Sequence, residues 1–204
     1  MKKLNPTKMD FSFLKINAFK IAFLLVLLLS SKLSQAQIFC TTTGINNSND
    51  EVKCMLQTID GGYALVGNSD SGFIQRIFIQ KYDALGNLNW SKVIRNNYSC
   101  VANSVVQLSD SALMVSGYMI TSSALLATEI ALVKVKLDGT ILFSKKIGNF
   151  PLASDESSYA SVSCSDGGVL LACQTNKNVN SPIDLMLVKI DAAGNIVWSR
   201  DLID

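Results

Sequence analysis

Aspartates recur along this chain at regular intervals, and carboxylates are the groups in it most able to do acid–base chemistry. Asp60, Asp110 and Asp166 each open one kind of short phrase, and Asp83 and Asp191 stand in another. Glycoside hydrolysis needs only two carboxyl groups that flank one bond, so a carboxylate-based hydrolase is one hypothesis. However, each aspartate lies beside turn-forming residues, which favours a structural role. We therefore expect no catalytic residue among them.

Several other chemistries lack the side chains that they need. The 204-residue chain contains no histidine, which excludes Ser-His-Asp and Cys-His nucleophile activation and every histidine-ligated metal site. No glycine-rich phosphate loop is followed by a helix. The acidic pairs at residues 50–51 and 155–156 match no calcium-binding loop, and we expect solvated surface there. The sequence thus predicts no catalytic, cofactor-binding or metal-binding residue and no cofactor.

The phrases that hold the aspartates recur, and their recurrence predicts the architecture. The first phrase is DGGYALVG at residues 60–67, and its counterparts are DSALMVSG at 110–117 and DGGVLLAC at 166–173. A second phrase follows each of these, as KYDALGNLNW, KVKLDGTILF and KIDAAGNIVW at 81–90, 134–143 and 189–198. A cycle of 50 to 56 residues indicates stacked supersecondary units.

One aromatic residue stands at the same phase of every cycle. Phe39, Trp90, Phe143 and Trp198 are 51, 53 and 55 residues apart. A large ring at one position per unit is expected to pack between neighbouring units. The alternative is that Trp90 and Trp198 are platforms on which a ligand stacks.

Each cycle contains four short apolar runs separated by turn residues, and these runs predict strands. In the first cycle they cover 52–58, 63–68, 77–82 and 88–94. Several runs are apolar at consecutive positions, as in strands that are buried on both faces. We predict an all-β fold of about three four-stranded antiparallel blades of an incomplete β-propeller. Because Ser111 and its neighbour replace Gly-Gly in the second cycle, we expect reshaped hairpins there.

The cycles also set the expected boundaries. The repeats run over about 39–89, 90–142 and 143–197, and a fourth begins at 198. Propellers usually have four to eight blades. Three cycles therefore suggest a fragment of a larger gene product, self-association that completes a ring, or an open three-unit stack. An open stack would expose apolar faces and sheet edges at both ends.

Residues 1–36 have the features of a secretory signal peptide. Five lysines precede an apolar run at Ile21–Leu29, and Ser34 and Ala36 are small residues suited to cleavage after Ala36. The remaining residues, 37–204, include twelve basic and fifteen acidic side chains, so no basic excess points to nucleic acid. We predict an exported protein, secreted or on the cell surface, with no stable membrane span after cleavage.

Five cysteines follow the predicted leader: Cys40, Cys54, Cys100, Cys164 and Cys173. Export permits disulfides, but an odd number leaves at least one thiol without a partner in the chain. Their spacings match no zinc-binding pattern. We expect most of them to pack as small apolar side chains, with at most one disulfide.

The two phrases resemble those of repeat proteins secreted by Bacteroidetes-type bacteria, which carry DGGY…G and KxDxxGNxxW repeats. The resemblance extends over about residues 39–204 and implies β-propeller blades and a link to type IX secretion. The second phrase is also similar to the tryptophan repeats of quinoprotein-like propellers. That likeness implies the fold alone, because such enzymes hold a quinone with calcium, an acidic base and typically adjacent cysteines, and no Cys-Cys pair occurs here.

The link between the second and third strands differs most from cycle to cycle, over residues 69–75, 118–129 and 175–184. Loops on a rigid scaffold often carry function, although neutral drift explains the differences equally well. The candidate recognition residues are Ser71, Gly72, Phe73, Tyr118, Asn178, Asn180 and Pro182.

The leading hypothesis for function is a non-enzymatic, exported repeat module for binding, adhesion or scaffolding, as part of a larger surface or secreted protein. Its partner would be an unidentified protein or glycan. The alternative is a fragment of a carboxylate-based glycoside-active or quinoprotein-like enzyme. A hydrolase would require acidic side chains from two or more units to meet in one cleft.

Overall fold

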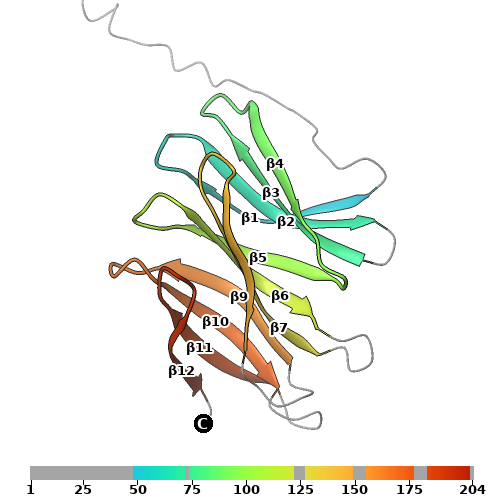
Figure 1. The fold of residues 1–204 in the computed structure, drawn as a ribbon, viewed down its shortest axis with the longest axis vertical. Coiled ribbons are helices and arrows are strands. Elements are labelled where there is room, and N and C mark those ends of the chain that lie inside the picture. The colour runs from blue at the N-terminus through green and yellow to red at the C-terminus, as the bar shows by residue number, and fades with distance from the viewer. Residues whose placement is uncertain (1–47, 72–73, 122–126, 149–154, 177–182, 203–204) are drawn as a thin grey trace, which may run out of the picture. The chain divides into compact units, whose positions relative to one another are not determined.

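The computed structural model describes residues 48–71, 74–121, 127–148, 155–176 and 183–202, in which every regular element is a β-strand (Figure 1). The twelve strands are β1 (Asn49–Gln57), β2 (Tyr63–Ser71), β3 (Ile74–Tyr82), β4 (Leu88–Ile94), β5 (Cys100–Gln107), β6 (Leu113–Ile120), β7 (Thr128–Val135), β8 (Ile141–Ile147), β9 (Asp155–Ser163), β10 (Val169–Asn176), β11 (Asp184–Ile190) and β12 (Ile196–Leu202). No helix that could cross a membrane occurs in this described part of the chain. The predicted all-β fold is confirmed.

Consecutive strands pair in antiparallel hairpins and form three four-stranded sheets. The orders are β1-β2-β3-β4, β5-β6-β7-β8 and β9-β10-β11-β12. The four runs of each cycle thus become four strands of one sheet, as the sequence predicts. Each sheet ends with the strand that carries its aromatic residue. Trp198 accordingly lies in β12, the last strand of the third sheet, where the sequence cycle had placed the start of a fourth unit.

The first hairpin of each sheet turns in the same way, although the second sheet lacks the Gly-Gly pair. In the first sheet, Thr58 N donates to Gly62 O and Gly61 N donates to Thr58 O, both at 2.8 Å. Leu108 and Ser111 donate the corresponding bonds at 2.8 and 2.9 Å, with Ser111 at a φ of 66°. Glycine adopts positive φ most easily, but the same turn forms around Ser111. The reshaping expected for this hairpin is therefore wrong.

Apolar side chains between the sheets form two clusters. One lies between the first and second sheets and includes Val66 of β2 and Val133 of β7. The other lies between the second and third sheets and includes Leu132 of β7 and Leu171 of β10. Leu132 and Val133 are neighbours in the chain, so β7 is covered on both faces, as its consecutive apolar residues predict. Burial of one such side chain stabilises the fold by about 1.5–3 kcal/mol.

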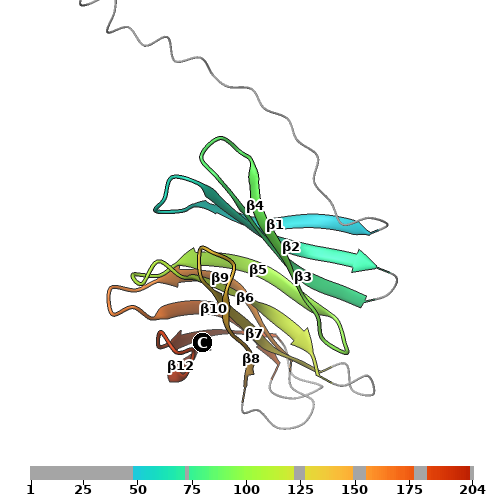
Figure 2. The same ribbon diagram turned by 45° about the horizontal axis from the view of Figure 1, so that its top comes forward.

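The sheets approach one another most closely along their first strands. β5 contacts β1, β2 and β3, and β9 contacts β5, β6 and β7. Figure 2 shows the three sheets as successive layers, with β5 and β9 side by side where the second and third sheets meet. All of the described residues belong to one compact unit, residues 42–204. Sheets that stack along a shared inner edge are the blades of a propeller-like fold.

The four cysteines in the described part of the chain are free thiols: Cys54, Cys100, Cys164 and Cys173. Cys100 and Cys173 are buried members of the two apolar clusters. Burial raises the pKa of Cys173 to about 12. These two residues pack as small apolar side chains, which agrees with the expectation from sequence. Cys40 lies outside the described residues.

Candidate functional site

The aspartates of the first phrase are tied to lysines of their own sheets. Asp60, Asp110 and Asp166 each accept a hydrogen bond from the backbone N–H two residues later. Each also pairs with a buried lysine, at 3.0 Å from Lys81, 2.7 Å from Lys134 and 2.8 Å from Lys189. Hydrogen bonds from the lysines are the main cause that lowers the pKa of Asp110 and Asp166, and one from Thr58 is the main cause at Asp60. These carboxylates stabilise the hairpins and the buried lysines.

The aspartates of the second phrase cap the turns in which they lie. Asp83 Oδ1 accepts hydrogen bonds from the backbone N–H groups of Leu85 and Asn87, both at 2.8 Å. Asp191 Oδ1 accepts the equivalent pair at 2.9 and 2.8 Å. Hydrogen bonds within the turn lower the pKa of both aspartates. The matching turn of the second sheet, residues 136–140, closes with the same 2.9 Å backbone bond, so it is not reshaped either.

The hydrogen bonds and ion pairs of these recurring aspartates lie within single sheets. Each of these carboxylates is thus engaged within its own sheet, whereas the hydrolase alternative requires acids of two units in one cleft. Among the residues that the structure describes, no group of three or more histidine, cysteine, aspartate or glutamate side chains is placed to hold a metal ion.

A different set of side chains comes together through a β-bulge in the first strand of each sheet. The bulged residues are Lys53 in β1, Asn103 in β5 and Tyr159 in β9, each an extra residue between two paired neighbours. A bulge bends its strand and redirects the extra side chain. The three sheets thus bulge at the same point and present a cation, an amide and a phenol there.

Glycine makes the first two bulges possible. A Cβ atom on Gly67 would lie 2.0 Å from the carbonyl oxygen of Glu51, and one on Gly117 would lie 1.8 Å from that of Val101. Real Cβ atoms do not approach an oxygen so closely, so in the first and second sheets these two positions have room only for glycine. In the third sheet Cys173 stands at this place, opposite Ser158.

Tyr118 of β6 lies next to these bulges. Burial raises the pKa of its phenol, and the nearby Tyr159 of the third sheet raises it further, whereas Lys53 of the first sheet lowers it. A charge shifts a pKa in this way only when it is near the titrating group. Side chains of the first and third sheets therefore lie near Tyr118 of the second sheet. We call Lys53, Asn103, Tyr118 and Tyr159 the bulge site.

Hydrogen bonds between neighbouring sheets hold the bulges in place. Asn103 Nδ2 donates to the carbonyl oxygen of Ser158 at 2.8 Å. The hydroxyl oxygens of Ser104 and Ser161 are 2.7 Å apart, and the Ser158 hydroxyl donates to Ser116 Oγ at 3.1 Å. These contacts fix β9 against the second sheet on both sides of Tyr159. A binding site gains precision when its side chains are supported in this way.

The bulge site has the chemistry of recognition. Tyr159 is 54% exposed and offers a ring face to an apolar surface. Its hydroxyl and the Asn103 amide can donate and accept hydrogen bonds, and the Lys53 ammonium can donate them. Lys53 pairs with Glu51 at 2.6 Å, but an exposed pair of this kind is weak and leaves the ammonium able to meet a ligand. The four side chains contain no nucleophile with an adjacent base.

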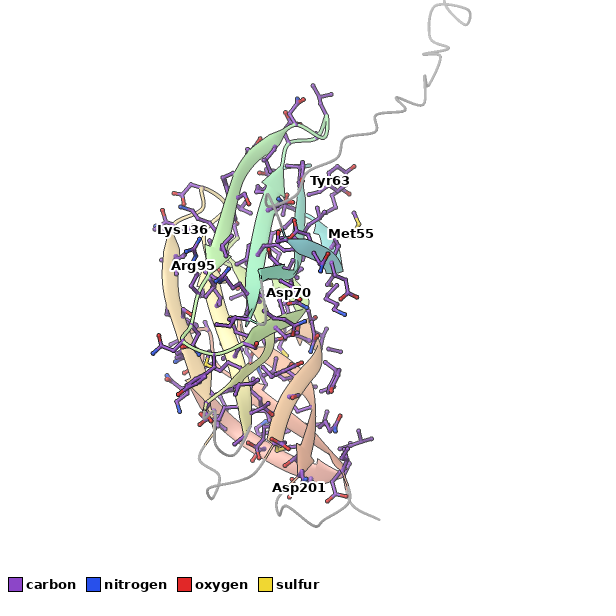
Figure 3. The ribbon with its side chains drawn as sticks, turned by 90° about the vertical axis from the view of Figure 1, so that its right-hand side faces the viewer. Met55, Tyr63, Asp70, Arg95, Lys136 and Asp201 are labelled. Atoms are coloured by element: carbon purple, nitrogen blue, oxygen red, sulfur yellow. The ribbon has the colours of Figure 1, made fainter. Side chains whose placement is uncertain are left out.

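A hollow with a volume of about 400 Å³ lies between the first and second sheets and has a cationic rim. The rim is formed by Arg95, Lys145 and Lys146. Figure 3 shows Arg95 on the opposite side of the sheets from Met55 of β1. Lys146 pairs with Glu129 at 2.8 Å, and Lys145 donates to a turn of the third sheet at 2.7 Å. Among the described residues, no aromatic side chain lines this hollow, so we favour the bulge site with its exposed Tyr159 ring.

The structure places two of the predicted recognition residues in strands. Ser71 is the last residue of β2, and Tyr118 lies inside β6. The predicted links were too long because backbone pairing continues through their polar residues, as far as Ser71 opposite Ile74 in the first sheet. Tyr118 belongs to the bulge site. The remaining predicted residues lie outside the described residues: Gly72, Phe73, Asn178, Asn180 and Pro182.

Sequence reasoning missed Lys53, Asn103 and Tyr159. A bulge is a mismatch between two paired strands, so it cannot be seen in one strand alone. The available signal was a glycine inside each of two strand-like phrases, at Gly67 and Gly117. Glycine in a strand interior often marks a bulge, and it would have directed attention to the strand opposite.

Comparisons with known proteins identify no family. No protein-family model matches the chain, and no curated protein matches it. Among solved structures, it is similar to one described as a crystal structure of a protein of unknown function from Bacteroides caccae at 1.35 Å resolution. The TM-score is 0.39 at 10% sequence identity, and the match covers 78% of this chain and 69% of that chain.

Proposed function

We propose that this protein is a non-enzymatic, exported β-propeller repeat module that binds a glycan or protein partner, for adhesion or as a scaffold. Residues 1–36 would direct its export, and it would act within a larger surface or secreted protein. The observation that supports this most is the bulge site, where three sheets bulge at the same point with different side chains and two of these, Lys53 and Tyr159, act on Tyr118. A repeated scaffold with different residues at one repeated position is suited to recognition.

A glycan is the partner class that the bulge site fits best. A sugar ring has one apolar face, which suits the exposed ring of Tyr159. Its hydroxyl groups suit the mixture of donors and acceptors on Lys53, Asn103 and Tyr118. Ligand sites in general combine apolar surface with a few polar groups that fix orientation.

The recurring carboxylates support a binding role over a hydrolytic one. Five of them are engaged in turns or with lysines, as described above. A retaining or inverting hydrolase needs two carboxyl groups about 5 to 10 Å apart across one bond. The four side chains of the bulge site include no carboxylate, and the Glu51 carboxylate beside Lys53 is held in an ion pair.

Calorimetric titration of the full chain with a panel of soluble oligosaccharides tests this proposal. We expect at least one oligosaccharide to bind, and we expect Tyr159→Ala to weaken that binding about tenfold or more, as for a central aromatic contact. Tyr98→Ala is the matched control, because Tyr98 is also an exposed tyrosine, 36% accessible, outside the bulge site. This control should bind as the unchanged protein does.

Two results would contradict the proposal. One is equal affinity of Tyr159→Ala and the unchanged protein for every oligosaccharide that binds. The other is the release of new reducing ends from any of these oligosaccharides, which would favour the hydrolase instead.

A further inference from the structure

The hollow between the first and second sheets combines an apolar floor with a charged rim. Its floor is formed by side chains of both sheets: Ile77, Ile94, Cys100, Met119, Ala131 and Val133. Ile77, Ala131 and Val133 are each only 1% exposed and belong to the apolar cluster between these sheets. The volume of about 400 Å³ lies in the range of small-molecule sites. The hollow therefore offers a ligand an apolar surface that continues into the core.

Small side chains of the second sheet account for this space. Ala131 of β7 pairs with Gly117 of β6. In the third sheet the same two positions are held by Met186 and Cys173. Met186 is buried in the apolar cluster between the second and third sheets. Protein interiors are closely packed, so an alanine and a glycine in place of a methionine and a cysteine leave room at the first interface.

Contacts through sulfur atoms connect the two sheets around the hollow. Cys100 Sγ donates to Ile94 O at 3.6 Å and lies 3.8 Å from Gln75 O. Asn96 Nδ2 donates to Met119 Sδ at 3.6 Å. Each of these contacts is weak, but together they join the second sheet to the end of β4. The walls of the hollow are thus held by both sheets, as in a site that exists before its ligand binds.

Arg95 is the cation of the rim that is best placed to meet an anion. It directly follows β4 and is exposed, and within the described part of the chain no hydrogen bond or ion pair engages its guanidinium. The ammonium of Lys145 instead reaches a turn of the third sheet. Lys146 adds a positive charge, which Glu129 balances at 2.8 Å. A guanidinium matches a carboxylate with two parallel hydrogen bonds, so the rim favours a carboxylate at Arg95.

We propose that this hollow binds a small amphipathic carboxylate, a molecule with one carboxylate group and a hydrocarbon tail. The tail lies on the apolar floor and the carboxylate binds Arg95. The volume equals that of roughly a dozen water molecules at about 30 Å³ each, which suits a ligand of about ten non-hydrogen atoms. A sugar fits poorly, because its hydroxyl groups would lie unpaired against the floor. This site is separate from the bulge site and does not depend on the proposed function.

Titration of the full chain with sodium octanoate, followed by NMR of its methyl groups, tests the proposal. The methyl resonances of Ile94 and Met119, on the floor, should shift in a saturable way. That of Ile141, which is 42% exposed outside the hollow, should not shift. 1-Octanol has the same tail without the charge, and acetate has the charge without the tail. Each should bind at least about tenfold more weakly than octanoate.

Two variants separate the roles of the rim and the floor. Arg95→Gln should weaken octanoate binding about tenfold or more and should remove the preference for octanoate over 1-octanol. Arg200→Gln is the matched control, because Arg200 is an exposed arginine of β12 outside the hollow, and it should bind octanoate as the unchanged protein does. Ala131→Met fills the hollow with the side chain that the third sheet carries at the same position, and it should abolish the shifts.

Three results would each overturn the proposal. The first is the absence of a saturable shift at Ile94 and Met119 up to about 10 mM octanoate. The second is equal affinity for octanoate and 1-octanol in the unchanged protein. The third is unchanged octanoate binding by Arg95→Gln, which circular dichroism must show to be folded. If Ala131→Met does not fold, the comparison of the two ligands and the Arg95→Gln variant still decide the outcome.

Discussion

At the scale of single residues, buried lysines explain why the first and second phrases recur together. The Lys81 side chain is only 1% exposed, and a buried ammonium is costly unless its protons have acceptors. Lys81 Nζ donates to Tyr82 O at 2.9 Å and pairs with Asp60 at 3.0 Å. The aspartate that opens the first phrase thus forms an ion pair with the lysine that opens the second. This is why a carboxylate stands at the first hairpin of every sheet.

The lowered pKa of Asp110 and Asp166 predicts a loss of stability in acid. A folded pKa below the ordinary 3.8 gives stabilisation that is complete above the unfolded value and is lost as pH falls through the folded one. We expect the free energy of unfolding, measured by urea titration, to decrease from about pH 5 to pH 2. The free energy of unfolding of the Asp166→Asn variant should decrease less steeply over the same pH range. Because these carboxylates are half-exposed, solvent screening keeps the effect small. Equal slopes for the two proteins would contradict this account.

At the scale of strands, each sheet has two β-bulges with different roles. One lies in its first strand, and the other lies in its fourth strand, directly before the aromatic residue. The bulge in the first strand directs a side chain to the bulge site, and the bulge in the fourth strand directs a ring to the next sheet. Both keep their register from sheet to sheet. The scaffold therefore repeats while the side chains that it presents can differ.

The first-strand bulge predicts that Gly117 cannot carry a side chain. Gly117→Ala places a methyl group on the carbonyl oxygen of Val101 and should cost about 1–3 kcal/mol in the free energy of unfolding. The control is Gly61→Asn, in an open turn where Cβ would meet only Ala84 at 3.9 Å. This change should cost less than about 1 kcal/mol, because asparagine tolerates positive φ. Urea titration measures both, and equal losses would exclude the bulge as the cause.

The packing of Trp90 on a turn of the second sheet predicts different costs for the same substitution in two sheets. Trp90→Ala removes a ring packed on Gly139 and its bond to Leu137 O, and should cost about 2–4 kcal/mol. Trp198→Ala removes an exposed ring and should cost less than about 1 kcal/mol in dilute protein. Thermal or urea unfolding distinguishes them. Similar costs would show that the ring of the third sheet is already packed within one chain.

At the scale of the molecule, the sequence predicted most of the architecture. The runs of 52–58, 63–68, 77–82 and 88–94 became β1 to β4, because apolar runs between turn residues depend mainly on local patterning. The prediction that one ring per unit packs between sheets is confirmed for Trp90 and Phe143. The bulge site could not be predicted, because its residues meet only when the three sheets stack. It also depends on a register shift between two paired strands, which one strand alone does not reveal.

The proposed signal peptide at residues 1–36 leads to a further prediction. Protein recovered from the medium or the cell envelope of a secreting bacterial host should begin at Gln37, because small residues at positions 34 and 36 suit cleavage there. N-terminal sequencing measures this. Ala36→Lys should block processing and retain the longer chain. Uncleaved protein that stays in the cytoplasm would contradict the proposed export.

The convergence of three sheets on Tyr118 is tested most directly by titrating its phenol with NMR. The pKa of Tyr118 should lie above the ordinary 10.0, because burial and Tyr159 raise it. Lys53→Gln should raise this pKa further by removing a nearby positive charge, and Tyr159→Phe should lower it. A Tyr118 that titrates at 10.0 and responds to neither change would contradict the placement of the three sheets around it.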